Sequence, residues 1–171
     1  MAIKLKTWRT MANDGTSLTM PSFTDIATDD LILVTLGKDG SSGTWAESGS
    51  SDYTAGPSDV GGAGNINAAS FYRKATSGSE TPRIFDSGVS TDCGGFVLVF
   101  SGVDTTTAFD DTGQDTTSSA SAALTTTALT TTVSNTLLVW FAFADGGRGL
   151  NMPPGYMGLN PPPYVGAAQS N

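Results

Sequence analysis

The sequence predicts an all-β protein, an antiparallel β-sandwich of the jelly-roll-like kind. Three observations lead to this fold class. Short apolar runs are separated by turn residues at a spacing of roughly 8–12 residues, which is typical of sandwiches and barrels. Thr and Gly are abundant while charged residues make up only 14% of the chain, a composition that favours strands over helices. No stretch keeps the apolar period of a helix over several turns.

The amino-terminal part predicts two strands joined by a tight turn. Residues 3–8 alternate apolar and polar side chains, as in a strand with one buried face. Asn-Asp-Gly at 13–15 is a tight-turn signal. A second strand follows at 16–24, and Pro21 either interrupts it or confines it to a sheet edge, because proline cannot donate to a ladder.

Four more strands are predicted in the middle of the chain. Residues 31–37 and 94–102 are continuous apolar runs, too short for helices, that predict buried strands. Residues 68–78 and 81–88 predict two further strands, and residues 44–66 predict a long loop. On the strand at 68–78, one face carries Phe71, Arg73 and Ala75, and the other carries Tyr72, Lys74 and Thr76.

The carboxyl-terminal part contains a partial internal repeat. Residues 124–146 resemble residues 18–40, which predicts a strand around Leu129 and an apolar strand at 135–147. We therefore expect one sandwich domain over residues 1–149 and an extended Pro/Gly-rich tail over residues 150–171. Two alternatives stay open: the partial copy completes the first unit, or the tail reaches a neighbouring subunit.

Charge and composition exclude several function classes. Sixteen acidic residues oppose eight basic ones, and the chain has no His. Too few cations are present for phosphate neutralisation or for attachment to anionic lipid, so neither nucleic acid nor membrane is expected as a partner. His-based acid–base, triad and zinc chemistry are excluded, and no phosphate-binding loop or nucleophile elbow occurs. We expect no enzyme activity and no cofactor, and a buried, unreactive Cys93.

Carboxylates offer one candidate metal site. Asp110, Asp111 and Asp115 lie within six residues, a density of oxygen ligands that suits calcium. The favoured interpretation is a solvated turn, because Asp side chains in turns bond to the local backbone. The neighbouring acids at 29–30 and 110–111 are not expected to form catalytic pairs, since adjacent strand residues point to opposite faces.

Aromatic residues are the candidates for contact with a partner or a glycan. Trp45 and Tyr53 lie in the Gly- and Ser-rich loop, where they could form a sugar-stacking platform on the surface. Tyr156 and Tyr164 are further candidates in the tail. Packing in a core or an interface is the favoured alternative, because aromatic side chains dominate both. Trp140, in an apolar run, is expected in the core.

Three short motifs resemble a pattern of bacteriophage virion proteins and some bacterial surface proteins. The first is an x-Y-x-K-A-T strand, the second a G-x-E-P turn, and the third a strand ending in Y-x-G-V-D-x-x-x-P-F-D. Thr81 is inserted in the turn, and Ala108 replaces the proline of the third motif. A P-P-x-G-W motif is missing after Gly40, and a variant of it with Tyr156 occurs near the carboxyl terminus. The matching residues are Tyr72, Lys74, Ala75 and Thr76; Glu80 and Pro82; and Gly102, Val103, Asp104, Phe109 and Asp110.

The resemblance implies a jelly-roll-like sandwich in a phage structural or accessory protein, with no shared catalytic residues. We expect a capsid decoration or cement protein, made in the host cytoplasm and located in the virion. Its expected partners are the major capsid protein or tail proteins, together with further copies of itself. Two alternatives are a tail or fibre accessory protein that contacts host glycan and a secreted carbohydrate-binding module. Gly102 and Asp104 are expected to turn the chain out of the buried strand, and Phe109 to pack the following crossover onto the core.

Overall fold

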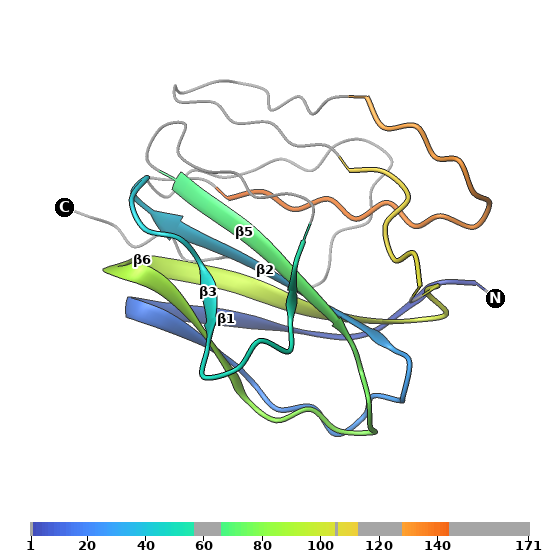
Figure 1. Ribbon diagram of the computed structural model, residues 1–171, viewed down its shortest axis with the longest axis horizontal. Coiled ribbons are helices and arrows are strands. Elements are labelled where there is room, and N and C mark those ends of the chain that lie inside the picture. Colours follow the sequence, from blue (N-terminus) through green and yellow to red (C-terminus); the bar gives the residue numbers. More distant parts are fainter. Residues whose placement is uncertain (1, 57–65, 105, 113–127, 144–171) are drawn as a thin grey trace.

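The described part of the protein is a single antiparallel sheet. The computed structural model describes residues 2–56, 66–104, 106–112 and 128–143 (Figure 1). These residues contain no helix, and therefore none that is long and apolar enough to span a membrane. The order of the paired strands is β1-β6-β2-β5-β4, and β3 pairs with β6. The strands are β1 (Lys4–Met20), β2 (Leu31–Asp39), β3 (Ala46–Ser48), β4 (Thr54–Ala55), β5 (Ile66–Lys74) and β6 (Arg83–Ser101). This confirms the all-β, antiparallel prediction.

The turn predicted at residues 13–15 is wrong, because β1 runs through this position. Asn13, Asp14 and Gly15 pair with residues 93, 92 and 91 of β6, and the next register shift comes after them, between Gly15 and Ser17. An Asn-Asp-Gly turn forms a hairpin only where the flanking strands pair with each other. Here both flanks pair with β6, so the chain continues. β1 ends directly before Pro21, as expected of a residue that cannot donate to a ladder.

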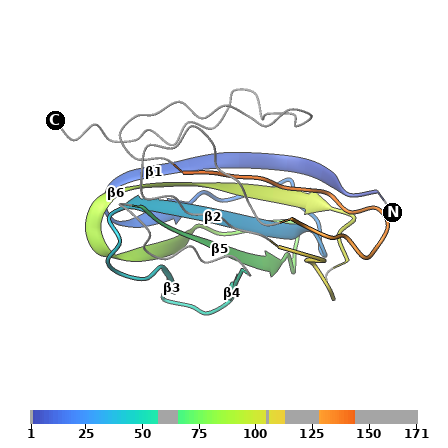
Figure 2. The same cartoon turned by 90° about the horizontal axis from the view of Figure 1, so that it is seen from above.

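The strands predicted at 81–88 and 94–102 are likewise one strand. β6 spans 19 residues, and its register against β1 jumps from Thr91 to Asp86. Figure 2 shows β6 bending back at this point. Ser87, which is fully buried in the bend, donates its hydroxyl to the carbonyl oxygen of Thr16 at 2.9 Å. The bend therefore links β6 to the matching irregularity of β1.

The bend brings the carboxyl-terminal end of β1 and the amino-terminal end of β6 onto one face of β2. Leu18, Phe85 and Val34, from β1, β6 and β2, belong to the same buried cluster. Phe85 is fully buried, and its ring lies 5.2 Å from the ring of Phe71 and 5.5 Å from that of Tyr53, centroid to centroid. We call this cluster the inner core. It also contains Ala75 of the segment after β5, so the faces predicted for residues 68–78 are confirmed for Phe71 and Ala75.

The opposite face of the sheet carries a second, smaller cluster, the outer cluster. Its buried members come from β2 and β6, and the half-buried Tyr72, Phe109 and Phe143 pack against it. The ring of Phe143 lies against Gly37, where an added Cβ would overlap the ring carbons. The buried members are Leu31, Leu33, Phe96, Leu98 and Phe100.

The strands predicted around Leu129 and at 135–147 are not formed in the described residues 128–143. In Figure 2 this segment lies along the sheet without joining it. β6 already pairs with β1 and β2, and β2 with β6 and β5, so the strands beneath the segment have no free ladder edge. Val139 and Phe143 of the segment pack against the sheet face instead. Trp140, expected in the core, is half-buried.

Candidate functional site

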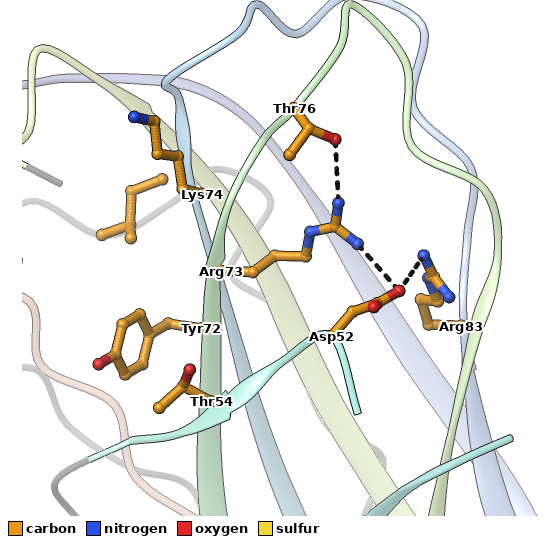
Figure 3. A pocket seen from close by; sticks show the side chains of 8 residues that line it. Asp52, Thr54, Tyr72, Arg73, Lys74, Thr76 and Arg83 are labelled. Atoms are coloured by element: carbon orange, nitrogen blue, oxygen red, sulfur yellow. Dashed lines mark hydrogen bonds and ion pairs between the residues drawn. The ribbon is translucent and has the colours of Figure 1, made fainter. Parts of the chain in front are cut away.

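A surface pocket of about 700 Å³ lies where β4 stops pairing with β5 (Figure 3). β4 pairs with Phe71 and Tyr72 only, so β5 continues past it along an open edge. Most side chains around the pocket are polar or charged, and Leu31 and Tyr72 supply its apolar part. The lining residues are Leu31, Asp52, Thr54, Tyr72, Arg73, Lys74, Thr76 and Arg83.

Two arginines dominate one wall of the pocket. Asp52 bridges them, with a carboxylate oxygen 3.6 Å from a guanidinium nitrogen of Arg73 and 2.7 Å from one of Arg83. Beneath them, the buried Glu80 accepts hydrogen bonds from Arg73 at 3.2 Å and from Arg83 at 3.3 Å. The Arg73 guanidinium also lies 5.5 Å from the centre of the Tyr53 ring. Both cations are thus fixed by contacts on several sides.

The electrostatics of this wall are balanced within the protein. Glu47 adds a third carboxylate, 4.0 Å from Arg83, and it accepts the backbone N–H of Tyr53 at 2.9 Å. Burial opposes the charge on Arg83, but its hydrogen bond to Glu80 and the charges of Asp52, Glu80 and Glu47 outweigh burial and raise its pKa. Two guanidinium groups therefore face three carboxylates. Such a wall offers directed hydrogen bonds to a polar ligand rather than excess positive charge.

Trp45 and Tyr53 do not form a surface platform, because their side chains are only 5% and 6% exposed. Both belong to the inner core, which agrees with the favoured alternative of core packing. The Tyr53 hydroxyl contacts the sulfur of Met20 at 3.4 Å, and Trp45 has the ammonium of Lys38 5.5 Å from its ring centre. The Gly- and Ser-rich composition predicted a surface loop here, but β3 and β4 hold it against the sheet.

The two described acids of the calcium candidate bind backbone groups. Asp110 accepts the N–H of Thr132 at 2.6 Å, and Asp111 accepts the N–H of Thr130 at 2.6 Å. Hydrogen bonds from Thr132 hold the pKa of Asp110 below its usual value. Asp115 lies outside the described residues, as do Tyr156 and Tyr164. Within the described ranges, no group of three or more His, Cys, Asp or Glu side chains gathers around a point.

The crossover after β6 behaves as expected. Gly102 has a positive φ of 77°, and Asp104 accepts the N–H of Thr106 at 2.9 Å, which forms the exit turn. The ring of Phe109 packs edge-on against Tyr72, with the ring centres 4.9 Å apart. Phe109 thus fixes the crossover to the outer cluster, and a smaller depression of about 290 Å³ lies beside it.

Cys93 lies inside the fold, as predicted. Its side chain is 6% exposed, and its sulfur contacts the carbonyl oxygen of Asn13 at 3.4 Å. Burial, followed by the charges of Asp92 and Asp14, raises the pKa of the thiol. A thiol that resists ionisation is a weak nucleophile.

The sequence did not single out the arginine wall of the pocket. The motif comparison marks Glu80 only as part of a turn, and the composition of residues 44–66 predicts a loop around Asp52. One signal was available, since charged residues are scarce in this chain and seven of them stand at positions 47–83. Five of the seven form the wall: Glu47, Asp52, Arg73, Glu80 and Arg83. Which acid meets which base depends on how β5 and β6 are brought together, so the spacing alone does not reveal the pairs.

Comparisons with models of known protein families, with curated proteins and with solved structures find no match to this chain.

Proposed function

We propose that this chain is a non-enzymatic structural protein of a tailed-bacteriophage virion, most concretely a capsid decoration or cement protein that bridges neighbouring shell subunits. Its partners are then the major capsid protein or other virion proteins. The jelly-roll-like sandwich is part of the same proposal. In that arrangement, residues 128–143 belong to a second layer over the outer cluster.

The observation that carries an assembly role is the apolar surface of residues 128–143. Val133, Leu137 and Leu138 are 61%, 43% and 51% exposed, although they are large and apolar. The same segment packs Val139 and Phe143 against the outer cluster, so it contacts the sheet and presents apolar side chains to the outside at once. Exposed apolar side chains grouped on one segment are typical of protein–protein contact surfaces.

A shell context makes such a modest surface effective. Many symmetry-related copies of a weak contact act together, because binding at one site raises the effective concentration at the next. The acidic balance of the chain, with a net charge of −8, disfavours non-specific attachment to nucleic acid during assembly.

Quantitative mass spectrometry of purified particles tests the proposal. A copy number comparable to that of the shell subunit supports decoration of the capsid, whereas a few copies per particle indicate a tail component. Absence from the particles contradicts every virion role. As a second readout, Leu137→Lys with Leu138→Lys is expected to abolish incorporation, while Thr107→Lys, at an exposed position outside this segment, is expected to be incorporated normally.

The pocket favours glycan binding as the alternative function. The chain would then be a tail or fibre accessory protein or a secreted carbohydrate-binding module. Its supporting observation is a pocket that combines the ring of Tyr72 with the polar groups of Asp52, Thr54 and Arg73. Sugar sites need such a mixture of stacking and directed hydrogen bonds. Glycan-array binding that is lost in Asp52→Ala and kept in Thr107→Lys would support this alternative over capsid decoration.

A further inference from the structure

The outer edge of β1 is the long open edge of the described sheet. β1 pairs with β6 and with no other described strand along its 17 residues. β6 and β2 have neighbours on both sides, and the shorter β5 is covered on its outer side by β4 at Phe71 and Tyr72 only. Figure 1 shows β1 at the margin of the sheet. Along it, residues such as Arg9, Thr10 and Ala12 are exposed. An edge of this kind presents unpaired backbone donors and acceptors to any second strand.

Features that protect edges occur at the ends of β1 and not in its middle. The register shifts between Leu5 and Thr7, which leaves Lys6 as an extra residue, and it shifts again after Gly15. Between these irregularities, residues 7–15 pair one to one with residues 91–99 of β6, without a bulge and without proline. Bulges, lysines and prolines are the usual means of preventing edge pairing, so the middle of β1 remains competent to pair.

Arg9 is the charged residue in the first half of this regular stretch, and its side chain binds groups of the same chain. Arg9 donates to the hydroxyl of Thr7 at 2.7 Å and to the carbonyl oxygen of Trp8 at 2.8 Å. Its guanidinium also lies 5.5 Å from the centre of the Phe23 ring. A carbonyl oxygen has two lone pairs, so the oxygen of Trp8 can still accept a second bond. Arg9 therefore does not block the edge.

The charges along β1 are divided between its two ends. Lys4, Lys6 and Arg9 stand in the amino-terminal half. Asp14 stands at the other end, where it pairs with Asp92 of β6. Antiparallel pairing of two identical edges places the basic half of one opposite the acidic half of the other, whereas parallel pairing places like charges together.

We propose that β1 of one copy pairs antiparallel with β1 of a second copy, which joins two sheets across a two-fold axis perpendicular to them. A register centred on Met11 uses the whole regular stretch. It places Thr7 opposite Gly15, Trp8 opposite Asp14, and Arg9 opposite Asn13, with no like charges face to face. The interface is self-complementary, as a two-fold contact must be. This inference does not depend on a role in virions.

The test uses the whole chain in solution. Light scattering coupled to size-exclusion chromatography over a dilution series is expected to show a monomer–dimer equilibrium. Hydrogen exchange is expected to be slower for the amides of residues 7–15 at high concentration than at low concentration. Ala12→Lys places a lysine in the middle of the edge and is expected to raise the dimer Kd roughly tenfold or more.

Ile84→Lys is the matched control. Ile84 is 45% exposed, but it lies on β6 with β1 on one side and β3 on the other, so the same new charge does not meet the open edge. The control is expected to dimerise like the unmodified chain. A monomer at every concentration overturns the proposal. A dimer whose β1 amides exchange equally fast at all concentrations also overturns the proposal. This measurement uses the unmodified chain, so it does not depend on whether a variant folds.

Discussion

Phe85→Ala tests whether the amino-terminal part of β6 folds over the inner core. Phe85 is fully buried, whereas its neighbour Ile84 is 45% exposed. Truncating a buried Phe to Ala costs about 3–5 kcal/mol, because transfer free energy is lost and a cavity remains. The rings of Tyr53 and Phe71 lie 5.5 and 5.2 Å from that of Phe85, and such aromatic pairs add roughly 0.5–1.5 kcal/mol. We therefore expect a loss of about 4 kcal/mol.

Urea unfolding followed by tryptophan fluorescence measures this loss. The midpoint is expected to fall with an unchanged m value, and Tm to fall by roughly 8–16 °C in a chain of this size. Ile84→Ala is the matched control, and we expect it to cost about 1 kcal/mol or less, since its side chain is half in water. Equal shifts for the two variants would refute the assignment of faces, and with it the bend of β6.

Three further predictions concern the outer cluster, the Asp110 contact and the inner core. Gly37→Ala is expected to displace the ring of Phe143 and to speed proteolysis within residues 128–143, because the added Cβ would overlap the ring carbons; unchanged proteolysis would show that the ring does not lie there. Asp110→Asn is expected to speed hydrogen exchange at Thr132, whose N–H the carboxylate accepts, and equal exchange rates would contradict this contact. Burial raises the pKa of Tyr53, so its contribution to stability is complete below about pH 10 and is lost as the pH rises further; Tyr53→Phe should make the fall of Tm between about pH 9 and 11 less steep, and an equally steep fall would assign the effect to other groups.

Local pattern was enough to predict the fold class and several elements. The continuous apolar runs at 31–37 and 94–102 lie in strands because they are too short for helices. Alternation along residues 68–78 placed Phe71 on the inner face and Tyr72 on the outer one. The exit turn at Gly102 and the packing of Phe109 were also predictable, because they depend on residues close in sequence.

The predictions that failed depend on contacts between distant segments. Asn-Asp-Gly at 13–15 carries a turn signal, yet it lies in a continuous strand because β6 pairs with both of its flanks. Residues 135–143 have the pattern of a strand, but the ladder edges beneath them are occupied. Loop composition concealed the burial of Trp45 and Tyr53, which β3 and β4 bring against the sheet.

Composition and local pattern were enough to predict a protein built from strands with a buried Cys93, and the absence of His leaves no histidine chemistry in this sequence. These properties follow from composition and from the period of two in strand side chains. Which strands continue, which edge stays open and which charges meet depend on contacts between segments that are far apart in the sequence. The pairing of Arg73 and Arg83 with Asp52 and Glu80 and the open edge of β1 both arise from the order of strands in the sheet. That order is selected by the packing of the inner core as a whole, which no local window of sequence contains.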